Sequence, residues 1–431
     1  MHIRTVCCAA ISLFLGALVC PFPVAAQTPA GGQLRVFLDC NTRGCDFDYF
    51  RTEVPFVDYV RDRTDATVHV LVTTQPTGGG GTEYTMNFIG RKEMSGTSDT
   101  LSYIAPNAST DDDRRKGIAR TLKLGLVRYV ARTPSAGNLQ ITYAQPSAAA
   151  AAAAGPTRDR WNYWVFRTRA GGNFNGESSQ RFTNLNGSLS ANRTTKAWKI
   201  NTSLSGNYSE SSFTFSGGNK FTSYSRSYGL SELVVKSLGD HWSAGQRASV
   251  TSSTFLNQKV AARFAPAVEF NFFPYNESTR RSLTLLYSVG VNAYRYRDTT
   301  IFEKLEEVRP DNSLVASLSL TQPWGSVNSS IEGAAFLDDL SKRRLVLFNS
   351  VNARLVKGLS LNLFGSVSLV RDQLYLRKLG ATDEEILLQR RQLATSYRYF
   401  AGVSLTYTFG SIFNNIVNPR FEGSSGQIFF F

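Results

Sequence analysis

The sequence predicts an α+β N-terminal domain followed by an antiparallel transmembrane β-barrel of twelve strands. Three observations support this fold class: an apolar export signal at the start, a compact α/β pattern over residues 33–133, and repeated alternating segments between Trp161 and Phe409. Alternation with a period of two is typical of strands that have two unlike faces. Many such strands after an export signal indicate a barrel with an apolar outside and a polar inside.

Residues 1–26 have the pattern of a signal peptide. Arg4 supplies the positive charge, residues 9–19 form the apolar segment, and small residues precede Gln27. Cys20 lacks the small preceding residue of a lipidated cysteine, so a lipoprotein signal is disfavoured. No later segment has eighteen consecutive apolar residues, which disfavours a helical membrane protein.

The formal net charge is +14, but the basic residues are scattered along the chain. Nucleic-acid binding needs a concentrated basic patch, and export removes most such partners, so no nucleic-acid partner is expected. Removal of the signal leaves two cysteines, Cys40 and Cys45. A close pair in an oxidising compartment predicts a structural disulfide, and the spacing fits neither a Cys-x-x-Cys redox motif nor a zinc site. No cofactor is expected.

Residues 33–133 alternate between strand and helix patterns in the order β-α-β-β-β-α. The first helix pattern begins at Asp46 and continues through Val60, and the last begins at Thr110, where three aspartates favour a helix start. The expected strands are 34–40, 67–74, 84–89 and 101–104, and the last helix is 114–132. This element order and its position behind a signal resemble the small periplasmic α/β domains of TolB and of CsgG-like secretion proteins. The resemblance transfers no functional residue.

An alanine-rich linker, 134–157, connects this domain to the barrel at 158–410. The fourth strand changes the parity of its apolar residues between Leu230 and Leu233, which predicts a bulge. The twelve expected strands are 161–174, 182–191, 197–209, 223–236, 242–252, 260–273, 282–296, 313–321, 326–337, 344–355, 359–370 and 397–409.

The connections between these strands differ in length. Short breaks follow the even-numbered strands, and the longest follow strands three, seven and eleven, as expected for short periplasmic turns and long external loops. An even strand number returns the chain to the periplasm. With this topology every tryptophan lies at the periplasmic end, where the membrane interface favours it. These girdle residues are Trp161, Trp164, Trp198, Trp242 and Trp324. A secreted β-sandwich also alternates, but aromatic placement and strand length favour the barrel.

The C-terminus carries two aromatic endings. Tyr407 and Phe409 end the twelfth strand, whereas Gly426, Phe429 and Phe431 belong to a second segment that resembles the closing signal read by the barrel-assembly machinery. Counting this second segment as a strand would give an odd number. We therefore expect the twelfth strand to close the barrel and residues 411–431 to form a periplasmic tail.

The inward parity of the strands carries basic residues and one clear acid, Glu269. An open lumen of this kind would favour anions, and a narrow one would be filled and rigidified by paired arginines. Both alternatives stay open. Residues 371–396 form either a plug in the lumen or an external helix. The basic lumen residues are Lys199, Arg247, Arg263, Arg354 and Arg398.

Two functional classes follow. One is a barrel in outer-membrane lipid that presents residues 33–133 to a periplasmic protein or the cell wall, favoured by the basic face of the last helix. The other is a passive, porin-like channel. An enzyme is not expected, because the mature chain has only His69 and His241, neither within a nucleophile motif.

Overall fold

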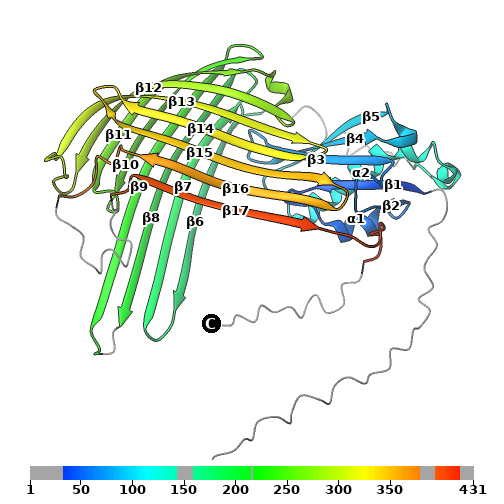
Figure 1. The fold of residues 1–431 in the computed structure, drawn as a ribbon, viewed down its shortest axis with the longest axis horizontal. Helices are drawn as coiled ribbons and strands as arrows, with labels where there is room; N and C mark the ends of the chain where they lie inside the picture. Colours follow the sequence, from blue (N-terminus) through cyan, green and yellow to red (C-terminus); the bar gives the residue numbers. More distant parts are fainter. Residues whose placement is uncertain (1–32, 143–158, 215–216, 379–393, 418–431) are drawn as a thin grey trace, which may run out of the picture.

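The computed structural model describes residues 33–142, 159–214, 217–378 and 394–417. It contains an N-terminal α/β domain and a large curved antiparallel sheet, which confirms the predicted fold class (Figure 1). Within these ranges, no helix has the length and apolar character that a membrane crossing requires.

The α/β domain has a five-stranded sheet in the order β2-β1-β3-β4-β5. Strands β2, β1 and β3 are parallel, and β4 and β5 are antiparallel to their neighbours. Its elements are β1 (Leu34–Cys40), α1 (Phe47–Glu53), β2 (Val57–Tyr59), β3 (Val68–Pro76), β4 (Thr82–Gly90), η1 (Lys92–Met94), β5 (Ser98–Ala105), α2 (Asp111–Val130) and η2 (Pro134–Asn138).

Helix α2 packs on β4 and β5 and contacts α1. The predicted start of this helix is confirmed, because Thr110 accepts from the Asp113 amide and the Asp113 side chain accepts from the Thr110 amide. Side chains at alternate positions of β1 and β3 join the apolar side of α2 in one core. Burial of this face therefore accounts for the strand alternation in the domain.

The first helix is shorter than the sequence pattern predicts. It ends at Glu53, and Val57 lies in strand β2 instead of on a helix face. Pro55 explains the difference, because a proline disfavours the α conformation of the residue before it. The predicted helix through Val60 was therefore wrong, and the domain has one more strand than expected.

The second sheet has twelve strands in sequence order, each antiparallel to the next. All twelve predicted strands are present. They are β6 (Trp164–Gly176), β7 (Gln180–Thr194), β8 (Trp198–Thr214), β9 (Lys220–Ser237), β10 (Trp242–Ser253), β11 (Gln258–Asn271), β12 (Arg281–Tyr296), β13 (Glu306–Gln322), β14 (Gly325–Phe336), β15 (Asp339–Val356), β16 (Leu359–Val370) and β17 (Tyr397–Tyr407), with η3 (Tyr275–Glu277) between β11 and β12.

Two details of the predicted sheet were wrong. Strand β9 pairs without interruption with both neighbours, so it has no bulge; its apolar residues Leu233 and Val235 face the inside instead. The break after β8 is also short, because the mostly polar residues Glu210–Thr214 continue the ladder with Lys220–Tyr224. Backbone pairing can extend a hairpin whatever the polarity of its side chains.

The two outer strands of this sheet are β6 and β17. No ladder joins them among the residues that the structure describes. Strands β6 to β8 run across the direction of β15 to β17, so the sheet forms a deeply curved, open wall (Figure 1). The α/β domain lies at the end of this wall where β15 and β17 end.

Gly125 tests the packing of α2 on β4. A Cβ there would lie 2.0 Å from the Phe88 ring. Helix propensity alone predicts that Gly125→Ala stabilises the domain, whereas the packing predicts destabilisation of roughly 1–3 kcal/mol. Amide hydrogen exchange in β4 and α2 measures the effect.

The matched control is Gly137→Ala, since a Cβ at Gly137 has no atom within 4 Å. Slower exchange in Gly125→Ala than in the unmodified protein would contradict this packing.

Candidate functional site: the domain–barrel junction and the lumen

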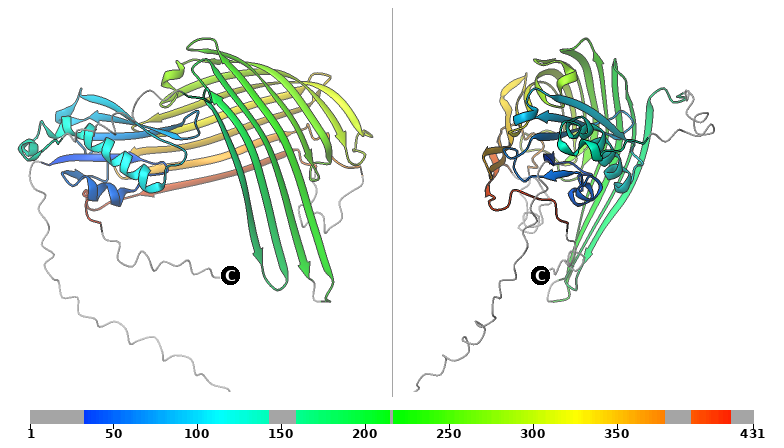
Figure 2. Two further views of the ribbon diagram at one scale, coloured as in Figure 1. Left: turned by 180° about the vertical axis from the view of Figure 1, so that it is seen from behind. Right: turned by 90° about the vertical axis from the view of Figure 1, so that its right-hand side faces the viewer.

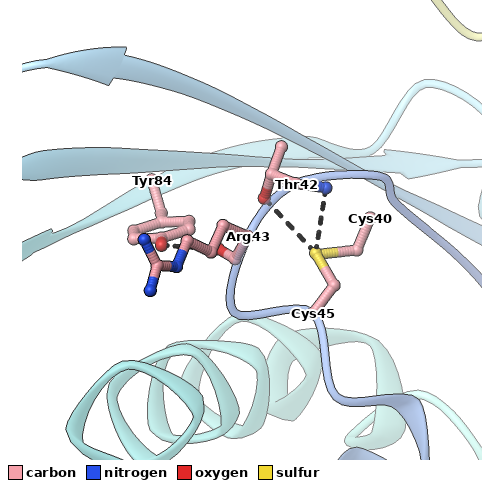
Figure 3. The surroundings of a disulfide bond; sticks show 5 residues. All are labelled: Cys40, Thr42, Arg43, Cys45 and Tyr84. Atoms are coloured by element: carbon pink, nitrogen blue, oxygen red, sulfur yellow. Dashed lines mark hydrogen bonds between the residues drawn. A yellow bond between two sulfur atoms is a disulfide. The ribbon is translucent and has the colours of Figure 1, made fainter. Parts of the chain in front are cut away.

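A disulfide fixes the loop after β1. Cys40 and Cys45 are bonded, as the sequence predicts, with 5.8 Å between their Cα atoms. The Tyr84 hydroxyl donates to the Arg43 carbonyl at 2.7 Å, which ties the same loop to β4 (Figure 3). The end of β1 is therefore held firmly, and Asp39, next to the disulfide, is held with it.

The face of β1 and β3 opposite the helices carries polar residues, yet it is covered. His69 is fully buried, and its Nε2 lies 3.2 Å from Oδ2 of Asp39. Leu71 and Thr73, on the same side of β3, are also buried. Other residues must therefore cover this face of the sheet. The contacts of Asp39 show that residues of the barrel are among them.

Arg354 of β15 makes that contact. Its two terminal nitrogens donate to the two carboxylate oxygens of Asp39 at 2.7 and 2.6 Å. Its guanidinium also lies 5.2 Å from the centre of the Phe37 ring, and it donates to the Pro323 carbonyl at 3.2 Å. A two-point, partly buried ion pair of this kind is directional as well as strong. Arg354, predicted as a lumen cation, is thus the barrel's partner for the α/β domain.

The ionisation of Asp39 reflects this setting. Burial raises the pKa of its carboxyl, but hydrogen bonds from His69 and Arg354 and their charges outweigh burial, so the pKa lies below its ordinary value of 3.8. The pKa of Asp62 is lowered in the same way. Burial raises this pKa, but hydrogen bonds from the amides of Thr64 and Gly358 lower it by more than burial raises it. Both carboxylates are therefore charged at neutral pH.

The loop after β2 extends the junction. Asp65 pairs with Lys357 at 2.7 Å, and Asp62 accepts from the Gly358 amide at 2.8 Å. Arg61 donates to the Phe409 carbonyl at 2.9 Å. These partners lie in the β15–β16 turn and just after β17, so the domain contacts the same end of three successive strands.

The segment after β17 continues the sheet of the α/β domain. Val60 bridges Phe413 in antiparallel fashion, the Arg61 amide donates to the Ile412 carbonyl, and the Asn414 amide donates to the Tyr59 carbonyl, the last two at 2.9 Å. The predicted periplasmic tail at 411–431 thus begins with an isolated antiparallel bridge next to the end of β2. Residues 418–431 lie outside the described ranges.

A second loop of the domain reaches the opposite edge of the large sheet. A Cβ at Gly78 would lie 2.8 Å from Cβ of Thr194, at the end of β7. A Cβ at Gly80 would lie 2.0 Å from a terminal nitrogen of Arg167 in β6. The domain therefore contacts β6 and β7 on one side and β15 to β17 on the other, across the mouth of the curved sheet (Figure 2).

The five tryptophans lie at this same end. Four of them precede or begin β6, β8 and β10, and Trp324 lies in the β13–β14 turn next to Pro323. All are partly or fully exposed. The structure therefore groups them as predicted at the end that carries the domain, and their role as a membrane-interface girdle stays a prediction.

The inside of the sheet contains a cavity of about 1030 Å³. Lys199, Arg247 and Arg263 line it, as predicted, and Arg398 is not among the lining residues. Arg263 pairs with Asp311 at 2.9 Å, and Arg344 pairs with Glu332 at 2.8 Å and with Asp372 at 3.1 Å.

Glu269 is consequently not the lone acid of the lumen. Asp311 was missed because the predicted strand began at residue 313, whereas β13 begins at Glu306. Antiparallel pairing of Pro310 with Val291 continues through this proline, so Asp311 joins the inner face. The inner charges nearly balance, in contrast to the basic lumen expected.

Residues 371–378 fold inward at the other end of the cavity. Leu374 is 3% exposed and packs with Tyr296 and Phe336. Thr300 bridges Arg377, and the Ile301 amide donates to the Leu376 carbonyl at 2.8 Å. The sequence left two alternatives for this loop, a plug in the lumen or an external helix. The described part, residues 371–378, agrees with the plug. Residues 379–393, which include the predicted helical series, lie outside the described ranges.

The basic face of α2 is largely neutralised. Arg115 and Lys116 pair with Asp112, Lys123 pairs with Glu53, and Arg128 pairs with Asp99. These pairs are exposed or partly exposed and contribute little stability. They nevertheless reduce the net positive charge of the face that was expected to contact a periplasmic partner.

The remaining predicted residues have simple surroundings. Nδ1 of His241 lies 2.7 Å from the Asn271 carbonyl, and its ring stacks on Phe270. Tyr407 and Phe409 stack, with ring centres 5.6 Å apart. Gly426, Phe429 and Phe431 lie outside the described residues. In the described part of the chain, no group of three His, Cys, Asp or Glu side chains is arranged to hold a metal.

Comparisons with known proteins give fold-level likeness alone. No family model and no curated protein sequence matches the chain. The similar solved structures include the NanC porin, at 8% identity with a TM-score of 0.27, over 56% of this chain and 99% of that one. They also include the translocator domain of the autotransporter NalP from Neisseria meningitidis, at 11% identity with a TM-score of 0.19, over 57% of this chain and 81% of that one. Both TM-scores are below 0.5, so the barrel assignment rests on the twelve-stranded sheet of this chain.

Reversing the charge at Arg354 tests the junction. Arg354→Asp leaves Asp39 without its partner and should weaken docking by on the order of 2–5 kcal/mol. Spin labels at Leu124→Cys on α2 and Lys259→Cys on β11 report the separation of domain and barrel. Arg354→Asp should broaden and lengthen that distance, and adding Asp39→Arg should restore it in part.

Arg343→Asp is the matched control, because Arg343 is exposed on the same strand and makes no ion pair with another described residue. An unchanged distance in Arg354→Asp would count against the junction.

Acid should also release the domain. Because the pKa values of Asp39 and Asp62 are lowered in the docked state, their contribution to docking is complete above 3.8 and is lost as the pH falls through the lowered values. The same spin-label distance should stay constant from neutral pH to about pH 4 and lengthen below it. Asp39→Asn should show a smaller acid-dependent change; release beginning near pH 6 would point to a histidine instead.

Proposed function

We propose that this protein is an integral outer-membrane barrel that anchors its own α/β domain across the periplasmic mouth. The observation that carries this proposal is the two-point ion pair between Asp39 of the domain and Arg354 of the barrel. The contacts of Gly78 with Thr194 and of Val60 with Phe413 support it from two further sides. In this arrangement the domain is both held by the membrane and presented to the periplasm.

The outer face of the sheet supports embedding in lipid. Apolar side chains at alternate positions are exposed on it, as expected where lipid tails replace water. Examples on three successive strands are Phe264, Val268, Leu285, Val289, Val291 and Leu314. A soluble protein rarely exposes an apolar surface of this extent.

The docked domain leaves its helical side for a partner in the envelope. The sheet side is occupied by the barrel, and α2 lies on the other side (Figure 2). Because the charges of α2 are mostly paired, we infer recognition by shape and hydrogen bonds, with a periplasmic protein or the cell wall as partner. An enzymatic role is not proposed.

A porin-like channel is the second candidate. Lys199 and Arg247 line the lumen without an ion pair to any described residue, which favours anions. The docked domain and the inward segment 371–378 both oppose free passage. Anchoring is therefore the better supported of the two roles.

Single-channel recording in planar bilayers separates the two. We expect the unmodified protein to show rare, small openings. Arg354→Asp, which loosens the domain, should raise the open probability several-fold, because docking free energies of a few kcal/mol correspond to large population changes.

Arg343→Asp should resemble the unmodified protein. A large, steady, anion-selective conductance in the unmodified protein would overturn the anchoring role in favour of the channel.

A further inference from the structure

We propose that the lumen cavity binds an amphipathic anion, a molecule with an alkyl chain that ends in a single negative group. This role goes beyond anchoring and is independent of it. Three features of the cavity point to such a ligand: an apolar inner wall, uncompensated cations beside that wall, and closure at the outer end.

The apolar wall lies on the inner face of β9 to β13. Leu233, Val235, Leu286 and Val315 all line the cavity. Lipid contact does not explain these residues, because barrels place apolar residues outside and polar ones inside. Two of them, Leu286 and Val315, are directly paired across β12 and β13. Leu286 and Val315 are themselves paired with the acids Glu269 and Glu332. The wall therefore consists of two apolar patches, and the small residues Ala265 and Ala267 of β11 lie between them.

Small residues keep this wall open. Val235 is paired with Gly245, and Gly245 with Ala267, so the row across β9 to β11 has little side-chain volume. A Cβ at Gly245 would lie 2.3 Å from the Val234 carbonyl oxygen. The close approach of strands at this point requires glycine, and the space in front of it belongs to the cavity.

Cations stand directly beside the apolar wall. Lys199 is paired with Val235 across β8 and β9, and Arg247 is paired with Leu233 across β9 and β10. Directly opposite residues in an antiparallel sheet have Cβ atoms about 4.5–5.5 Å apart. Each cation therefore adjoins an apolar side chain on the same face, which is the arrangement that an amphipathic anion matches.

These cations differ from those at the outer end. Arg263 and Arg344 make ion pairs with Asp311, Glu332 and Asp372. Lys196, Lys199 and Arg247 make none with another described residue, and the acids at their end are Asp240 and Glu269. Glu269 accepts a hydrogen bond from the Tyr275 hydroxyl at 2.8 Å. Three cations face two acids there, so the uncancelled positive charge lies at the periplasmic end.

The outer end is closed by Leu374, Tyr296 and Phe336, which pack together. A molecule that enters from the periplasmic side therefore meets apolar side chains at the far end of the cavity. The cavity volume of about 1030 Å³ is at the upper end of the usual range for small-molecule sites, about 300–1000 Å³. These features favour binding of a ligand over its free passage.

Photolabelling of the full-length protein in lipid nanodiscs tests the site. The probe is dodecanoate carrying a diazirine, and its neutral alcohol analogue is the chemical control. We expect saturable labelling by the carboxylate of peptides from β9, β12 and β13. Lys199→Glu and Arg247→Glu should each weaken binding of the carboxylate about tenfold, the usual effect of losing a charged hydrogen-bond partner, and change the alcohol little.

Lys259→Glu is the matched control, because Lys259 is exposed at the outer end of β11 and does not line the cavity. Val235→Asp should reduce labelling by both probes. Heat-dependent migration in gel electrophoresis shows that each variant retains its barrel. Labelling confined to lipid-facing residues, or equal loss in Lys199→Glu and Lys259→Glu, would overturn the site. Neither result affects the anchoring role, which depends on Arg354.

Discussion

The ion pair between Asp39 and Arg354 is the interaction on which the arrangement of the two domains depends. Asp39 is held by the Cys40–Cys45 disulfide beside it and by buried His69, and Arg354 is held at the end of β15. Burial of either charge without its partner is costly in free energy. The α/β domain therefore supplies the carboxylate that Arg354 needs, and the barrel supplies the guanidinium that Asp39 needs. The charge-rich loop Arg61–Asp65 and the backbone contacts of residues 412–414 then extend the contact.

A bilayer adds a constraint on the large sheet. Backbone groups in hydrocarbon must be paired, yet β6 and β17 are not joined to each other among the described residues. The α/β domain contacts β6 and β7 through Gly78 and Gly80 and holds the exit of β17 through Phe413. It thereby connects the first and last strands at the end of the sheet that carries the domain. A domain in this position also braces the gap between β6 and β17.

The sequence was informative about periodic features and uninformative about long-range partners. Alternation identified every barrel strand, and parity placed Lys199, Arg247 and Arg263 on the inner face. Parity could not show that Arg354 has a partner 315 residues away. In the sequence, Asp39 is only a residue near the end of an ordinary strand. Its role becomes visible only when it is known which face of the domain contacts the barrel. Two prolines affect their surroundings differently. Pro55 prevents α1 from continuing, whereas Pro310 is accommodated within β13.

In the proposed arrangement, the α/β domain spans the mouth of the barrel in the native membrane. A disulfide between Gly78→Cys and Thr194→Cys tests it most directly, because a Cβ at Gly78 would lie within contact distance of the Thr194 Cβ. We expect rapid cross-linking in isolated outer membranes under mild oxidation, and a much lower yield when Arg354→Asp is added. Absence of the cross-link in membranes that contain the folded barrel, or a yield unaffected by Arg354→Asp, would contradict it.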